Sequence, residues 1–94
     1  MAEIFNEIKL FWQKDCGKCP TAKNVLTELE KVGNVKIKIT SFDIGTLDGM
    51  TEAAFHEVLS TPTTIVVDKE ENELAAWRGE PPTLKELENL LIKE

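Results

Sequence analysis

The sequence predicts a single α/β domain in which a four-stranded mixed sheet is flanked by three helices. Four short segments have strand patterns, three others carry apolar residues at helical spacing, and together they follow the order β-α-β-α-β-β-α. A βαβ unit followed by a hairpin implies one mixed sheet with helices on both faces. The 94 residues leave room for one domain, residues 1–94, which is large enough to fold without disulfide staples.

The first strand is expected at residues 7–13, where apolar and polar side chains alternate. One face of this strand carries Ile8, Leu10 and Trp12. Phe11 on the other face indicates a strand that is covered on both sides. A helix is expected from Cys19 onward, and Gly33-Asn34 is typical of its C-terminal end. The helical spacing is carried by Ala22, Val25, Leu26, Leu29 and Val32.

A second strand and a second helix follow. The strand is expected around residues 35–40, with one face near solvent. Its alternating apolar positions are Val35, Ile37 and Ile39. The helix begins near Thr46 or Asp48, although Gly49 is unfavourable in its first turn. Its expected apolar stripe consists of Leu47, Met50, Ala54 and Val58.

The last part of the chain predicts a hairpin and a closing helix. Residues 63–67 are all β-branched, which favours a buried strand. The polar residues 68–73 are typical of a turn into a last strand at residues 74–78. Thr83 and Glu86 then have the spacing of a capping box at a helix start. The apolar face of this helix is formed by Leu84, Leu87, Leu90 and Leu91.

Composition excludes several classes of function. The chain has 11 basic and 17 acidic residues, so its net charge of −6 disfavours nucleic-acid binding, which needs a basic face. The longest apolar run, residues 74–77, is far too short to span a membrane. Residues 1–6 lack the pattern of a secretion signal, so we expect a cytoplasmic protein with no membrane partner.

Cys16 and Cys19 are the only cysteines of the chain. They lie where the first strand gives way to a helix, with two residues between them. Unpaired N–H groups and the helix dipole at such a position favour a thiolate, which is the nucleophilic form. A disulfide closing so small a loop adds little stability. The pair therefore predicts redox chemistry or metal binding rather than a structural bridge.

Three segments resemble the thioredoxin family. Residues 11–19, FWQKDCGKC, are similar to the thioredoxin active-site segment, in which Phe-Trp-Ala, two variable residues and Cys-Gly-Pro-Cys follow one another. Residues 60–63, STPT, resemble the second signature of that family, a Thr-Pro-Thr segment. Arg78-Gly79 and the leucine-rich helix after it match the closing strand, glycine and helix. The resemblance extends over essentially the whole chain.

The resemblance implies a thiol–disulfide oxidoreductase with no bound cofactor. Cys16 would attack a disulfide of a protein substrate, and Cys19 would resolve the mixed disulfide. Pro62 would be cis and would face the dithiol. Substrate contacts would come from Trp12, Gly17, Lys18, Thr61 and Pro62, with the backbone of Thr61 holding an extended polypeptide. The protein would act as a monomer, and a reductase or a low-molecular-weight thiol would restore its dithiol.

This chain departs from the thioredoxin pattern at three positions. Leu10 stands where the family has a buried acid, so another group or water must handle the proton of Cys19. Asp15 replaces a tryptophan, and Lys18 replaces the proline between the cysteines. The added cation should stabilise the Cys16 thiolate and lower the pKa of that thiol, making the redox couple more oxidising.

Other interpretations remain open. Glutaredoxins, the sister family, hold glutathione with a Gly-Gly and acidic-pair segment, whereas residues 78–82 here are RGEPP, and the chain has no tyrosine. Glutathione-dependent activity, a non-catalytic binding module and a dimer bridged by a metal or iron–sulfur centre are the alternatives. His56 is expected to be an exposed helix residue rather than a ligand, and Trp77 to pack on the last strand. Solvated faces are expected for Glu28, Glu30, Glu70, Glu71, Glu73, Glu86 and Glu88.

Overall fold

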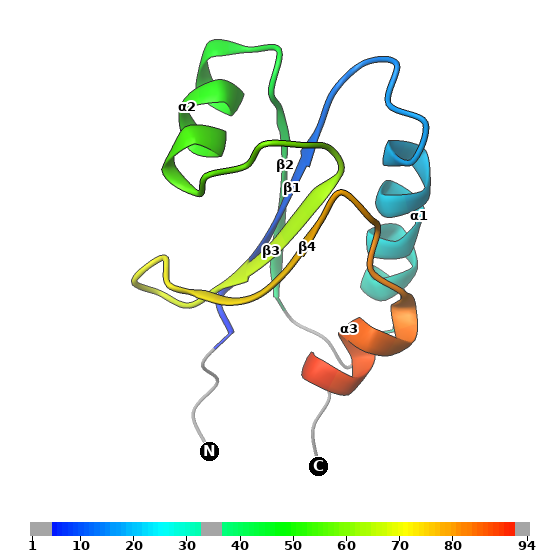
Figure 1. Ribbon diagram of the computed structural model, residues 1–94. Coiled ribbons are helices and arrows are strands. Elements are labelled where there is room, and N and C mark those ends of the chain that lie inside the picture. The colour runs from blue at the N-terminus through cyan, green and yellow to red at the C-terminus, as the bar shows by residue number, and fades with distance from the viewer. Residues whose placement is uncertain (1–4, 33–36, 92–94) are drawn as a thin grey trace.

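The computed structural model describes residues 5–32 and 37–91. A twisted four-stranded sheet lies between two helical layers, with α1 and α3 on one face and α2 on the other (Figure 1). The elements are β1 (Glu7–Trp12), α1 (Cys19–Glu30), β2 (Lys38–Asp43), α2 (Leu47–Phe55), β3 (Thr63–Val67), β4 (Glu73–Arg78) and α3 (Leu84–Leu91). The predicted order and fold class are confirmed. Within the described ranges, no helix is long and apolar enough to cross a membrane.

The sheet has the strand order β2-β1-β3-β4. β1 pairs in parallel with β2 and antiparallel with β3, which in turn pairs antiparallel with β4. Because β1 and β3 are the central strands, their residues are almost all buried, as their apolar and β-branched composition predicts. The register places Phe11 opposite Thr63, so the end of β1 nearest the cysteines lies beside the start of β3.

The larger core lies between the sheet and the layer formed by α1 and α3. Its buried members are Ile8, Leu10, Ala22, Leu26, Leu29, Val66 and Leu87. Trp77 packs partly buried against this cluster, as predicted. At the start of α3, the capping box is present: Glu86 N–H donates to Thr83 Oγ1 at 3.0 Å, and Thr83 N–H donates to Glu86 Oε1 at 2.9 Å. Helical periodicity therefore predicted the buried faces of α1 and α3 correctly.

The smaller core lies under α2, and here most of the predicted apolar stripe is wrong, since only Val58 of its four residues packs against this core. Leu47 and Met50 are exposed by 78% and 55%, and the buried residues of α2 are Gly49 and Ala53. A Cβ atom at Gly49 would lie 1.9 Å from the backbone oxygen of Asp43, which ends β2. The helix thus approaches the sheet so closely that only small residues fit between them, and its larger side chains point outward.

The second strand differs in position from its prediction. β2 begins at Lys38 and continues to Asp43, because each of its residues pairs with one residue of β1. Ile39 lies in the strand as expected, whereas Val35 and the predicted helix stop Gly33-Asn34 fall outside the described residues. The alternation of residues 35–40 therefore located a strand but set its bounds too early.

Candidate active site

Cys16 and Cys19 are joined by a disulfide at the start of α1, with their Cα atoms 5.4 Å apart. Cys16 lies in the connection after β1 and is half-buried, whereas Cys19 is the first residue of the helix and only 3% exposed. Asp15 has a positive φ of 60°, which turns the connection just before Cys16. One cysteine of the pair is thus within reach of another molecule, and the other lies beneath it.

The start of α1 is electrostatically suited to a thiolate. Lys18 occupies the N-cap position but makes no side-chain hydrogen bond to the helix, and Pro20 stands in the first turn, where a missing N–H costs nothing. No acidic residue lies in this first turn. The positive end of the helix dipole is therefore left uncompensated by a capping carboxylate beside Cys16, which favours a negative charge on its sulfur.

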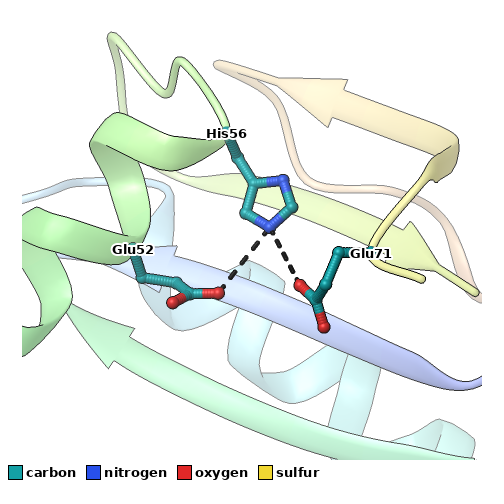
Figure 2. Close-up of side chains that lie close together, drawn as sticks. All are labelled: Glu52, His56 and Glu71. Atoms are coloured by element: carbon teal, nitrogen blue, oxygen red, sulfur yellow. Dashed lines mark ion pairs between the residues drawn. The ribbon is translucent and has the colours of Figure 1, made fainter. Parts of the chain in front are cut away.

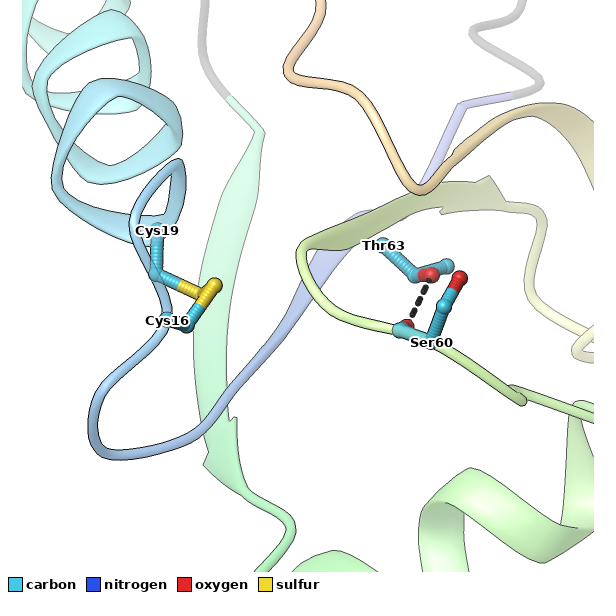
Figure 3. The surroundings of a disulfide bond; sticks show 4 residues. All are labelled: Cys16, Cys19, Ser60 and Thr63. Atoms are coloured by element: carbon cyan, nitrogen blue, oxygen red, sulfur yellow. Dashed lines mark hydrogen bonds between the residues drawn. A yellow bond between two sulfur atoms is a disulfide. The ribbon is translucent and has the colours of Figure 1, made fainter.

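A second loop faces the disulfide. Figure 3 shows the bonded sulfur atoms directed toward the loop that carries Ser60 and Thr63. The Thr61–Pro62 peptide in this loop is cis, as the resemblance implied, and Pro62 is fully buried while Thr61 is half-buried. Thr63 Oγ1 donates to the Ser60 carbonyl oxygen at 2.7 Å, which closes the turn.

The connection after β4 supports this loop from behind. Gly79 N–H donates to the Pro62 carbonyl oxygen at 2.9 Å. Gly79 has a φ of +83°, a conformation that favours glycine, and a Cβ atom there would lie 3.5 Å from Ser60 Oγ. The glycine that the sequence placed after the last strand therefore holds the cis-proline loop through its backbone.

Charged side chains form the rim of the site. Lys18 Nζ lies 2.6 Å from Glu80 Oε2, and both side chains are exposed. Lys23 Nζ lies 3.6 Å from the centre of the Trp12 ring, and Trp12 is half-buried. Neither Glu80 nor Lys23 was predicted from the sequence to belong to the site. The sequence feature that could have pointed to Glu80 is its position directly after Gly79, the residue that supports the cis-proline loop.

The Leu10 side chain is a buried hydrocarbon at the position where thioredoxins have an acidic residue. It is 1% exposed and belongs to the larger core. The site around the cysteine pair therefore has no carboxyl group at that position.

A buried charged cluster lies on the α2 side of the sheet, and it corrects the prediction for His56. His56 is 4% exposed rather than solvated. It caps the C-terminal end of α2, and the centre of its ring lies 6.2 Å from the centre of the Phe11 ring. Lys9, which is 3% exposed, forms ion pairs with Glu52 and Glu71. Lys9 Nζ also lies 3.2 Å from His56 Nε2. Figure 2 shows Glu52 and Glu71 on either side of the imidazole.

The pairing within this cluster shifts two pKa values. Burial disfavours the charged form of Lys9, but the hydrogen bonds to Glu52 and Glu71 outweigh it and raise the Lys9 pKa above 10.5. The hydrogen bond from Lys9 lowers the pKa of Glu71 below 4.5. The expectation of a solvated Glu71 is therefore wrong, whereas Glu73 is exposed as expected and pairs with Arg78 Nη2 at 2.8 Å.

The same cluster offers metal-ligand atoms. Ligand atoms of Glu52, His56 and Glu71 lie within 4.8 Å of one another. The Lys9 ammonium contacts all three groups, so it supplies the positive charge that a metal ion would bring there. This arrangement fits an ion cluster, one ammonium between two carboxylates, that ties β1, α2 and the turn between β3 and β4 together.

Several solved structures resemble this chain in fold. The chain superimposes on a malaria-parasite thioredoxin-2 described as a component of protein secretion machinery, with a TM-score of 0.77, 20% identity and coverage of 96% of this chain and 84% of that one. A thioredoxin-like protein from Clostridium perfringens gives a TM-score of 0.78 at 22% identity, covering 97% and 72%. The chain has a thioredoxin-like fold. Thioredoxin 1 from Thermosipho africanus gives 0.68 at 23%, covering 88% and 86%.

The comparisons by sequence found no relatives. No family model matches the chain, and no curated protein matches it. Two segments that lie far apart in the sequence, and that both carry family motifs, come together in this fold. They are the cysteine pair at the start of α1 and the Thr61–Pro62 loop. Gly17 and Lys18 lie exposed between the cysteines.

Proposed function

We propose that this protein is a thiol–disulfide oxidoreductase that cycles between a Cys16–Cys19 dithiol and the corresponding disulfide. One observation carries the proposal: the pair stands at a helix start, with Cys16 half-buried and Cys19 buried, opposite a cis-proline loop. This asymmetry suits an exchange reaction, in which the accessible cysteine attacks and the protected one resolves.

The reaction transfers two electrons. In the reduced protein, the Cys16 thiolate attacks one sulfur of a substrate disulfide, which forms a Cys16–substrate S–S bond and releases the first substrate thiolate. The Cys19 thiolate then attacks the Cys16 sulfur, breaks the mixed disulfide and releases the second substrate thiolate. Both substrate thiolates take up protons. The substrate is reduced to a dithiol, and the protein is oxidised to the Cys16–Cys19 disulfide.

The substrate is a polypeptide that carries a disulfide. The half-buried Thr61 precedes β3, so its backbone groups would bind an extended segment in the manner of an added strand. Trp12, Gly17 and Lys18 would supply the remaining contacts around Cys16. A dithiol reductase or a low-molecular-weight thiol would return the protein to its reduced form, as a reducing compartment such as the cytoplasm provides. We expect the protein to act as a monomer.

The proposal is tested by reduction of insulin with dithiothreitol as the electron donor. The parent protein should accelerate the reaction. The Cys16→Ser variant should lose turnover completely, whereas Cys19→Ser should accumulate a mixed disulfide that is visible by mass spectrometry. Parental activity in the Cys16→Ser variant would overturn the mechanism. The exposed Lys38, on the edge strand β2, provides a control variant, Lys38→Ser, that should keep full activity.

A further inference from the structure

An apolar groove lies on the α2 side of the molecule, and one of its lining residues, Leu59, directly precedes the loop that faces the disulfide. It has a volume of about 740 Å³ and is lined by residues of α2, of the segment after α2 and of the end of β4. Its most exposed apolar lining residues are Met50 and Leu59, which are 55% and 95% exposed. A leucine that is almost completely exposed next to an apolar groove is typical of a binding surface rather than of a solvated face.

The groove exists because of the way α2 packs. Gly49 and Ala53 face the sheet, and the close approach at Gly49 leaves no room for a larger residue there. Met50 is therefore turned away from the core. Leu59 lies in the segment between α2 and β3 and has no place in either core cluster. The apolar surface is thus a consequence of the fold that no described part of the chain covers.

This groove is continuous with the loop that faces the disulfide. Leu59 directly precedes Ser60, and Figure 3 shows the disulfide directed toward the loop that begins there. On the opposite wall, Arg78 directly precedes Gly79, whose N–H donates to the Pro62 carbonyl oxygen. A polypeptide bound along the Thr61–Pro62 loop would therefore reach the groove with residues close to its own disulfide.

The charge of the groove restricts its occupant. Arg78 is already held by Glu73 Oε2 at 2.8 Å and by the His56 carbonyl oxygen at 3.2 Å. Glu57 also lines the groove and forms no ion pair with any residue in the ranges 5–32 and 37–91. Together with the net charge of −6, this carboxylate favours a partner that presents positive charge near an apolar side chain.

We propose that this groove binds the disulfide-bearing substrate itself, by accepting an apolar side chain that lies near a basic residue in the segment around the substrate cysteine. The inference rests on the proposed function and names the substrate class of the same site. Because buried apolar contacts supply most of the energy in such an interface, the groove would make segments of this composition better substrates than polar ones.

Three synthetic peptides with one disulfide each test this inference. Their cysteines are flanked by leucine and lysine, by leucine and glutamate, or by serine and glutamine. With the parent protein, we expect the leucine–lysine peptide to be reduced with a kcat/KM about 5–20-fold above that of the serine–glutamine peptide. At low salt, it should exceed the leucine–glutamate peptide by about 2–5-fold, and high salt should remove this difference.

Substitutions in the groove test whether it causes the preference among the peptides. Met50→Gln and Leu59→Gln change exposed side chains of the groove and should bring the ratio between leucine–lysine and serine–glutamine peptides close to one. Leu47→Gln is the matched control, because Leu47 is an apolar residue of α2 whose exposure lies between those of Met50 and Leu59 and that does not line the groove. It should retain the parental ratio. The rate with a small aromatic disulfide should be the same in all four proteins.

The outcomes separate the two proposals. Reduction of all peptides at equal rates, or a peptide preference unchanged in both groove variants, would overturn the groove proposal and leave the exchange reaction standing. A concentration-dependent dimer in sedimentation that Leu59→Gln dissociates would assign the groove to a second copy of this chain and also overturn it. No reduction of any peptide or of the small disulfide would refute the proposed function itself.

Discussion

Lys18 Nζ and Glu80 Oε2 lie 2.6 Å apart, so this ion pair joins the residue just before Cys19 to the segment after β4. Glu80 follows Gly79, which supports the cis-proline loop through its hydrogen bond to Pro62. The cation that replaces the family's proline is therefore not free to act on Cys16 alone, since a carboxylate shares its charge.

Removal of this carboxylate should change the reactivity of Cys16. In Glu80→Gln, the Lys18 ammonium loses its partner and stabilises the Cys16 thiolate more strongly, so the pKa of the thiol should fall. Because both side chains are exposed, the change should be less than about half a pH unit. Rates of iodoacetamide alkylation against pH measure it. In a Lys18→Gln background, the same Glu80→Gln change should have no effect on the pKa, and an equal effect there would contradict the assignment.

The Lys9 cluster should contribute to stability and to its dependence on pH. In Lys9→Met, Glu52 and Glu71 lose their buried partner, and because both carboxylates are partly exposed, the free energy of unfolding should fall by about 1–3 kcal/mol. Urea denaturation measures this change. Lys38→Met, which removes an exposed lysine from the edge strand, should change stability by no more than about 0.5 kcal/mol. Equal losses in the two variants would contradict a special role for Lys9.

The sign of the pH dependence follows from the two shifted pKa values. The lowered pKa of Glu71 stabilises the fold above the ordinary carboxyl value of 4.5, and this contribution is lost as pH falls through the folded-state pKa. The raised pKa of Lys9 stabilises the fold below 10.5, and this contribution is lost as pH rises through its folded-state pKa. Unfolding curves from pH 2 to 6 should therefore show a steeper acid loss in the parent than in Lys9→Met.

Gly49 should be required for packing although it lies in a helix. An alanine normally favours a helix over glycine by about 1 kcal/mol. At this position its Cβ atom would lie 1.9 Å from the Asp43 backbone oxygen, so Gly49→Ala should instead destabilise the protein by about 1–3 kcal/mol. Gly17→Ala is the control, because a Cβ atom there meets nothing within 4 Å. A more stable Gly49→Ala protein in urea denaturation would refute the close approach of α2 to β2.

The reduction potential of the cysteine pair should distinguish turnover from a static bridge. We expect a value within the roughly −270 to −180 mV range of known exchange catalysts, because the helix start and Lys18 favour the thiolate and hence the reduced form. Equilibration with thiol–disulfide buffers, followed by alkylation and mass spectrometry, measures it. A potential well below about −300 mV would favour the alternative of a non-catalytic binding module.

Local sequence patterns were sufficient to predict an element where its buried face follows the period of the element or where its own neighbours cap it. The leucine face of α3 and its Thr83–Glu86 capping box were predicted correctly, because helical period and capping are local properties. The β-branched run of β3 correctly predicted a buried strand, because residue type alone favours that conformation. Most of the apolar stripe of α2 failed, because the distance between that helix and the sheet, and not residue type, decides which side can be buried.

The sequence by itself determined the element order, the thioredoxin-like fold and the cysteine pair at the start of a helix. Only the tertiary structure decided which distant residues meet at the site. Glu80 reaches Lys18 because the connection after β4 returns to the start of α1, and His56 is buried because the end of α2 packs against Phe11 and Lys9 of β1. Such contacts depend on how strands and helices are arranged in space, and a chain has no local pattern that records a partner more than 40 residues away.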